Sequence, residues 1–82
     1  MKIYDYFGKK NVSGERIREA RLKQRLSQTD LAAKMQVAGV TIERDSISRI
    51  EIGTRFVSDF EILKFSEILQ VSLEWLLGLE EE

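Results

Sequence analysis

Two short stretches decide the fold: LSQTDLAAKM, residues 26–35, and RDSISRIEIG, residues 44–53. In the first, a leucine and a serine precede apolar residues at helical spacing, which is typical of a helix start. In the second, Ile47 and Ile50 lie three positions apart, and Gly53 is a residue that commonly ends a helix. Together they predict a helix, a break and a second, shorter helix.

The second of these helices has two unlike faces. At about 100° per residue, Ile47, Ile50 and Glu51 share one face, which predicts a buried side with a carboxylate at its rim. Arginine can donate two hydrogen bonds to guanine, serine can bond to a base or a phosphate, and aspartate can accept from cytosine. Taken alone, this outer face also fits an ordinary solvated surface. Its residues are Asp45, Ser48, Arg49 and Ile52.

One local pattern recurs four times and predicts where helices begin. An apolar residue precedes a serine, and another follows four positions later, as in a hydrophobic staple around an N-cap. The four serines are Ser13, Ser27, Ser58 and Ser72, and Asp30 and Glu61 complete two capping boxes. The predicted helices run from Ser13 to Gln24 or Arg25, from Ser27 to about Gln36, through SISRIEIG to Gly53, from Ser58 to Leu69, and from Ser72 to Leu77 before Gly78.

The same periodicity predicts which side chains lie inward, and we expect no strand. The inward sets are Ile17, Ala20, Arg21 and Leu22 in the first helix; Leu31, Ala32 and Met35 in the second; and Ile62, Leu63, Phe65, Ser66 and Leu69 in the fourth. Residues 37–42, VAGVTI, are predicted to form a turn or a short extended segment.

The ends of the chain differ from its centre. Residues 1–12 form an N-terminal arm with Ile3, Tyr4, Tyr6 and Phe7, which is either mobile or folds back to pack its aromatic side chains; four bulky apolar residues favour partial order. Residues 13–78 form one domain, and residues 79–82 form an acidic tail that we expect to be solvated and frayed.

Composition narrows the classes of function. The 82 residues include no cysteine and no histidine, so a thiolate metal site is excluded and the commonest general base is missing. We therefore expect no enzyme activity, no metal and no other cofactor. No apolar run approaches the roughly 20 residues that span a membrane, and a signal peptide is not evident. The absence of cysteine fits a reducing cytoplasm, so we expect a cytoplasmic protein.

Charge is unevenly distributed along the chain. The net charge is −1, but residues 1–34 hold nine Lys and Arg against four Asp and Glu, whereas residues 56–82 hold one lysine against seven acids. Such a basic first half can bind a polyanion, although uneven charge is also common in small helical proteins.

Three stretches give the sequence a family resemblance: RIREARLKQRLSQTDLAAKM, SISRIEIGTR and DFEILKFSEILQVSLEWLLG. From about Ser13 to Gly78 the chain resembles the lambda-repressor-like family, the phage repressor and Cro type of helix-turn-helix regulators of bacteria and phages. The resemblance implies an all-α, compact five-helix domain that binds double-stranded operator DNA, usually as a homodimer. It also implies a bacterial or phage origin.

The family pattern implies roles for particular residues. The first helical position after Ser27 contacts a phosphate, which maps to Gln28 with Thr29 beside it. The exposed face of the next helix reads bases, and the following loop meets the DNA backbone. An arginine of the first helix pairs with a glutamate, which maps to Arg21 and Glu51. The base-reading positions are Arg44, Asp45, Ser46, Ser48 and Arg49, and the loop positions are Gly53, Thr54 and Arg55.

Two features depart from the family pattern. Ile52 stands where family members often have a polar residue, and it could touch sugars or a thymine methyl group, pack on the arm or mark a partner surface. The link QVAGVTIERD is about five residues longer than the family's usual turn. We expect this extended turn between the second and third helices to be a surface extension that leaves the helix pair intact.

Two functions follow from these features. The first is a sequence-specific transcriptional regulator, a repressor that places its third helix in the major groove. The alternative is a protein-interaction module of the same fold, such as an antitoxin or an anti-repressor, which the acidic last third, Ile52 and the aromatic arm would suit. Trp75, Leu73, Leu76 and Leu77 are expected to be core residues, part of which could supply a dimer contact.

Overall fold

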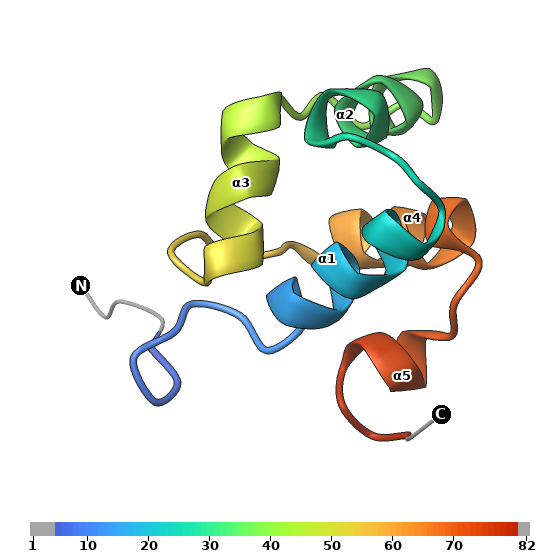
Figure 1. Cartoon of the computed structure of the whole chain (residues 1–82). Coiled ribbons are helices and arrows are strands. Elements are labelled where there is room, and N and C mark those ends of the chain that lie inside the picture. The colour runs from blue at the N-terminus through green and yellow to red at the C-terminus, as the bar shows by residue number, and fades with distance from the viewer. Residues whose placement is uncertain (1–4, 81–82) are drawn as a thin grey trace.

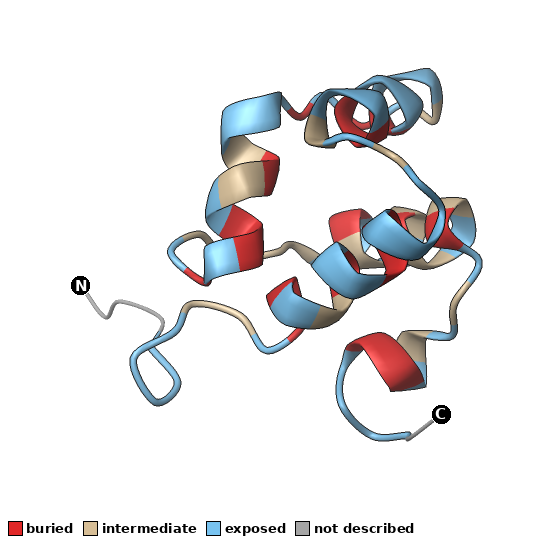
Figure 2. Cartoon of the chain, viewed as in Figure 1, coloured by how far each residue is buried: buried red, intermediate tan, exposed pale blue. Residues whose placement is uncertain are grey.

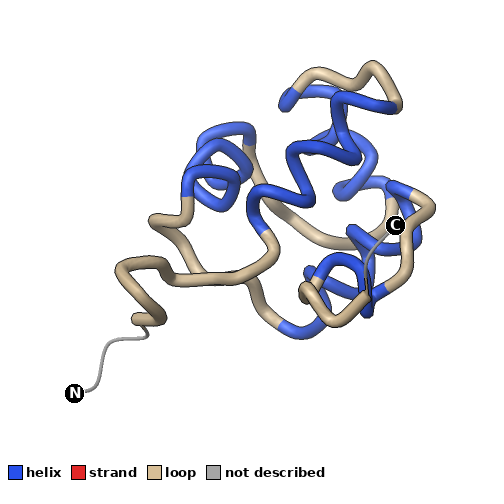
Figure 3. Tube along the Cα trace, turned by 60° about the horizontal axis from the view of Figure 1, so that its bottom comes forward, coloured by secondary structure: helices blue, strands red, loops and turns tan. Residues whose placement is uncertain are grey.

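The computed structural model describes residues 5–80 as a bundle of five helices. They are α1 (Gly14–Lys23), α2 (Gln28–Val37), α3 (Arg44–Ile52), α4 (Asp59–Leu69) and α5 (Leu73–Leu76). Helix α1 contacts α3, α4 and α5, while α2 contacts α3 and α4 (Figure 1). Over the described range no strand is present, as Figure 3 shows, and the expected all-α, five-helix fold is confirmed.

Three of the four predicted serine caps are present. The Ser27 hydroxyl accepts from the backbone N–H of Asp30, and the Asp30 carboxylate accepts from the N–H of Ser27, which completes the predicted capping box of α2. Ser58 and Glu61 form the same box at α4. The Ser72 hydroxyl accepts from the N–H of Trp75 at α5. Local sequence therefore fixes these three helix starts.

The predicted cap at Ser13 is wrong. Ser13 is buried and its side chain makes no cap hydrogen bond. The N–H of Gly14 instead donates to Oδ1 of Asn11 at 2.7 Å, and Val12, the expected staple residue, is 52% exposed. Asn11 of the arm therefore caps the first helix, and its hydrogen bonds to the carbonyls of Ile50 and Arg55 hold it in place.

All five helices end with the same hydrogen bond. The N–H of the residue after a left-handed position donates to the carbonyl five residues earlier, which is the Schellman arrangement. Glycine occupies three of the left-handed positions, whereas Arg25 and Gln70 adopt φ of 60° and 61° without being glycine. The five bonds join Leu26 to Arg21, Val40 to Met35, Thr54 to Arg49, Val71 to Ser66 and Leu79 to Glu74.

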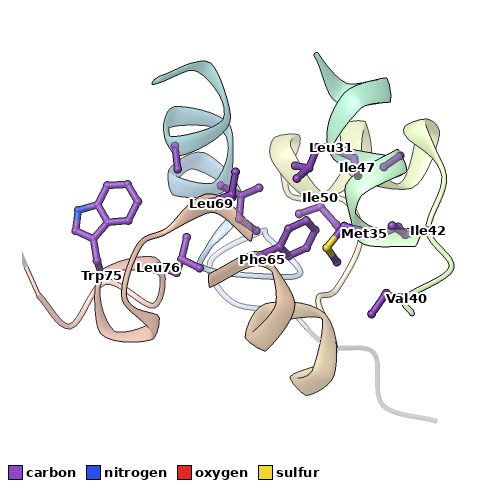
Figure 4. Close-up of a cluster of buried hydrophobic side chains, with 13 residues drawn as sticks. Leu31, Met35, Val40, Ile42, Ile47, Ile50, Phe65, Leu69, Trp75 and Leu76 are labelled. Carbon is purple, nitrogen blue, oxygen red and sulfur yellow. The ribbon is translucent and has the colours of Figure 1, made fainter. Parts of the chain in front are cut away.

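The core lies where the five helices meet. Phe65 of α4 occupies its centre, beside Met35 of α2 and Ile50 of α3 in Figure 4. The buried face of each helix is visible in Figure 2. The expected inward positions Ile17, Ala20, Arg21, Leu31, Ala32, Met35, Phe65, Leu69, Trp75 and Leu76 are all buried.

Three residues expected to lie inward are exposed. Leu22 of α1 is 47% exposed, Leu63 of α4 is 44% exposed, and Leu77 beyond α5 is 41% exposed. Each follows directly after a buried residue or lies beside a partly buried one, so the helical pattern places it at the edge of the apolar face. The core is therefore narrower than the count of apolar residues suggests.

The long link between α2 and α3 is not the surface extension that the sequence suggested. Residues 38 and 39 form a turn, and Val40 and Ile42 then point into the core with 6% and 2% exposure (Figure 4). The side-chain amide of Gln36 donates to the carbonyl of Ile42 and holds the segment in place. The added residues thus contribute two side chains to the core directly before α3 begins.

The described part of the arm folds back through its backbone, not its aromatic side chains. Tyr6 and Lys9 exchange two backbone hydrogen bonds around Phe7 and Gly8, both with positive φ, which forms a tight hairpin turn. Tyr6 and Phe7 pack on each other in a T-shaped pair but remain 59% and 86% exposed. The expectations for Ile3, Tyr4, Glu81 and Glu82 lie outside the described residues.

Candidate DNA-binding surface

The outer face of α3 is the centre of the candidate site. Ile47, Ile50 and Glu51 are buried on the inner face, as their spacing predicted. Arg49 and Ile52 point outward, and Ile52 is 62% exposed. Ser46 and Ser48 are half-buried on the flanks, and the Arg44 and Asp45 side chains are exposed and 3.6 Å apart.

A buried ion pair anchors this helix from behind. Nε and Nη2 of Arg21 in α1 donate to the two carboxylate oxygens of Glu51 at 2.7 and 3.1 Å. Their side chains are only 9% and 2% exposed. A buried charge without a partner costs several kcal/mol, so breaking this pair would strongly destabilise the fold. Because the two hydrogen bonds are bidentate, the pair also fixes the rotation of α3 about its own axis.

Gln28 joins the same ion pair. Its side-chain amide, at the first position of α2, donates to Oε1 of Glu51 at 3.0 Å. The backbone N–H groups of Gln28 and Thr29 have no acceptor in a preceding helical turn, and the positive end of the helix dipole favours an anion there. The side chain of Gln28 therefore connects the start of α2 to α3, while its backbone remains suited to a phosphate.

Two of the expected DNA contacts, Thr54 and Arg55, lie in the loop after α3, and their surroundings differ. Thr54 is exposed, although its hydroxyl lies 3.3 Å from the carbonyl of Arg49. The Arg55 guanidinium donates to both carboxylate oxygens of Glu61 at 3.0 and 3.1 Å and is only 20% exposed. Arg55 thus holds the loop against the start of α4, and the structure places its charge away from open solvent.

The environment of Glu61 shifts its acidity. Burial of the carboxyl group by itself would raise the pKa of Glu61. Hydrogen bonds from Arg55 and from the Ser58 backbone, together with the positive charge of Arg55, outweigh burial and hold this pKa below its ordinary value. The carboxylate is therefore ionised at neutral pH and keeps Arg55 in place.

The expected contact residues belong to three neighbouring parts of the fold: the start of α2, α3 and the loop after α3. In Figure 1, α3 lies at one side of the fold, with α2 next to its upper end and the loop after α3 at its lower end. The pair of Arg21 and Glu51 supports α3 from its inner face, and Arg55 faces inward. A helix of nine residues presented in this way has the dimensions to enter a DNA major groove.

A short helix presented outward beside a capped partner helix is the arrangement found in helix-turn-helix domains. The helix-turn-helix family model matches residues 17–76, which is most of the chain, so the protein belongs to the lambda-repressor-like helix-turn-helix family, whose members are DNA-binding regulators. No curated protein and no solved structure matched the chain.

Two other structural features are absent from residues 5–80. None of the helices there is long and apolar enough to cross a membrane. Groups of three or more acidic side chains arranged to hold a metal ion are likewise missing from this range.

Sequence reasoning missed two residues that shape the site. Asn11 forms hydrogen bonds with α1, with α3 and with the loop after α3. The one signal in the sequence was its position three residues before Gly14, which suits a helix cap. Glu61 was recognised as a capping residue but not as the partner of Arg55. Both depend on contacts made by a folded loop, which local periodicity does not reveal.

Proposed function

We propose that this protein is a sequence-specific transcriptional regulator that represses transcription by occupying an operator. The outward face of α3 carries the proposal, because it presents a cation, hydroxyl groups and an acid on a helix anchored by a buried ion pair. Helix α3 enters the major groove. Its base-reading residues are Arg44, Asp45, Ser46, Ser48 and Arg49.

Contacts to the DNA backbone flank this helix. The backbone at Gln28 and Thr29 faces a phosphate on one side, and Thr54 faces the other strand beyond the end of α3. Arg55 contributes indirectly, because its pair with Glu61 orders the loop that carries Thr54. Phosphate contacts set the register of α3, and the side chains of α3 select the sequence.

The regulator acts as a homodimer on its operator and works in the cytoplasm. Two copies related by a two-fold axis would place their recognition helices about 34 Å apart, one turn of DNA. Trp75 and Leu76 are buried within one copy, so the exposed Leu77 and Leu79 are the better candidates for the contact between copies.

Arg49→Ala is the direct test of this function. Arg49 is exposed and its side chain is not needed for the core, so the variant should fold normally. We expect it to weaken binding to a selected operator by about 1–3 kcal/mol and to relax the preference at one base pair. The measurement is a mobility-shift titration against sequences recovered from random DNA, with Lys34→Ala on the far end of α2 as the control. Unchanged binding by folded Arg49→Ala would contradict base reading by α3.

A second function has its own observation. Phe60 and Leu63 are 58% and 44% exposed on α4, in the acidic third of the chain. Such a face suits a protein partner, as in an antitoxin or an anti-repressor, and that role is compatible with DNA binding. Copurification of a stoichiometric partner that is lost on Phe60→Ser would favour it, and operator binding by the isolated protein would show that the partner is not required.

A further inference from the structure

Asn11 connects three parts of the fold through one side-chain amide. Its Nδ2 donates to the carbonyl of Ile50 in α3 at 3.0 Å and to the carbonyl of Arg55 in the following loop at 2.8 Å. Its Oδ1 accepts from the N–H of Gly14 at the start of α1. The amide thus ties the arm, the first helix and the end of α3 together, although it precedes the family-matched segment, which begins at residue 17.

Three close approaches strengthen this connection. The N–H of Lys10 donates to the carbonyl of Gly53 at 2.8 Å. A Cβ atom added to Gly53 would lie 2.6 Å from Cδ of Lys9, so the stem of Lys9 crosses directly over this glycine. A Cβ added to Gly14 would collide with the carbonyl oxygen of Ile50. The arm is therefore seated on the end of α3 with little intervening space.

This seating brings two cations beside the candidate DNA surface. Lys9 and Lys10 are consecutive, and the stem of Lys9 and the backbone of Lys10 lie against Gly53, the residue before Thr54. The only ion pair of Lys9 in the described range is with Glu15 at 3.7 Å, between side chains that are 47% and 85% exposed, so it is weak. In Figure 1 the arm projects past the end of α3 on the same side as the loop after α3.

We propose that Asn11 is a positioning residue that holds Lys9 and Lys10 against the phosphates flanking the α3 contact, and so extends the DNA footprint beyond the family-matched domain. This inference rests on the proposed function, because it requires that α3 binds duplex DNA. Asn11 itself stays behind the surface and acts through the two lysines. The ligand is the phosphodiester backbone, so the added contact is independent of base sequence.

The salt dependence of DNA binding tests this role. Each phosphate neutralised by a cation contributes about 0.9 to the slope of log K against log salt. Lys9→Gln with Lys10→Gln should lower the slope by about 1–2. Asn11→Ser should lower it by a similar amount, although no charge is removed, because the freed arm no longer holds its lysines on the DNA. A residue with a purely structural role would change the affinity without changing this slope.

The combined variant separates positioning from an independent effect. If Asn11 acts through the lysines, adding Asn11→Ser to Lys9→Gln and Lys10→Gln should lower the slope no further. The probe is a duplex recovered by selection from random DNA, bound by the full chain. Lys34→Gln, which removes an exposed cation at the end of α2, should leave the slope unchanged. Thermal unfolding of every variant confirms that it is folded at the assay temperature.

Each outcome decides one part of the inference. A wild-type slope in the double lysine variant overturns it, whatever Asn11→Ser does. A wild-type slope in folded Asn11→Ser, with a lowered slope in the lysine variant, shows that Asn11 does not position the arm. Asn11→Thr, which also keeps a hydroxyl acceptor for Gly14, replaces Asn11→Ser if that variant unfolds. Failure of the wild-type protein to bind DNA would instead refute the proposed function itself.

Discussion

The carboxylate of Glu51 shows how much a single residue can organise in a small domain. It accepts from Arg21 of α1 and from Gln28 of α2 while belonging to α3, so three helices meet at two oxygen atoms. No buried side-chain N or O atom in the described range lacks a hydrogen-bond partner. The charges inside this small core are therefore fully satisfied, which is what allows the core to contain them.

Removing one partner of the buried pair should be strongly destabilising. Glu51→Ala leaves the Arg21 charge buried without its carboxylate, and we expect the free energy of unfolding to fall by about 3–5 kcal/mol. Urea unfolding followed by circular dichroism measures this change. Glu19→Ala, at an exposed position on α1, serves as the control.

Replacing both partners shows whether Glu51→Ala destabilises the fold through an unpaired buried charge or through lost packing. Arg21→Met combined with Glu51→Leu removes both charges and should recover part of the stability that Glu51→Ala loses. If the double variant is less stable than Glu51→Ala, the pair contributes more than mutual neutralisation, and our account of it is wrong.

The lowered pKa of Glu61 makes stability depend on pH. Because its folded pKa lies below the unfolded value, its contribution is present above the unfolded pKa and is lost as pH falls through the folded one. The pKa of Asp30 is also lowered, by its backbone and side-chain hydrogen bonds with Ser27. Protonation of Asp30 at acid pH therefore also lowers the stability of the fold. We expect the melting temperature to fall as pH drops below about 4.5, the ordinary value for Glu.

An uncharged variant measures how much the Glu61 carboxylate contributes to the pH dependence of stability. Glu61→Gln should be less stable than wild type at pH 7, and the difference should shrink at acid pH, where the wild-type carboxylate is also neutral. Glu74→Gln, at an exposed position on α5, is the matched control. A difference that stays constant from neutral to acid pH would show that the charge of Glu61 contributes nothing.

At the scale of the helices, the starts of α2, α4 and α5 are encoded locally, whereas the start of α1 and the link between α2 and α3 are not. Ser27, Ser58 and Ser72 could be predicted as caps because both partners of each bond lie within three residues. The path of Val40 and Ile42 into the core depends on the packing of the other helices, which no short window of sequence contains. The cap of α1 depends on Asn11, whose other partners lie 39 and 44 residues away.

The left-handed positions at the helix ends predict that one substitution lowers the free energy of unfolding and another raises it. Gly39 has φ of +92° and no atom within 4 Å of an added Cβ, so Gly39→Ala is strained only by its backbone and should cost about 1–2 kcal/mol. Gln70 has φ of 61°, and Gln70→Gly should stabilise by about 0.5–1 kcal/mol once the entropy of glycine is counted. Chemical denaturation of both variants measures the two effects. Equal signs would contradict the left-handed geometry at one of these ends.

For the whole molecule, the sequence predicted the fold class and the buried face of α3. It did not predict which of the expected contact residues are already bonded to other residues of the protein. Arg55 was expected on DNA from its place after α3, yet its side chain pairs with Glu61 six residues later. Gln28 was expected on a phosphate, yet its amide also bonds Glu51. Periodicity assigns a residue to a face, but competition between partners is settled only when the helices pack.

Dimer formation is the prediction that belongs to the whole molecule. We expect two copies per operator duplex, because one recognition helix spans only half of a symmetric site. Light scattering at several concentrations, with and without selected DNA, gives the stoichiometry. Leu79→Ser should weaken association, and Val37→Ser, a change at the 90% exposed end of α2, should not. A single copy on every selected duplex would refute the dimer.

The separation of the two faces of α3 has a consequence for how such a protein changes. Stability is concentrated in Ile47, Ile50 and Glu51, whereas Asp45, Arg49 and Ile52 point outward from the core. Substitutions on the outward face can therefore accumulate without unfolding the domain. A lineage that inherits this scaffold is free to acquire a new target by exchanging a few exposed side chains, and the same freedom is open to an engineer who grafts a different recognition surface onto it.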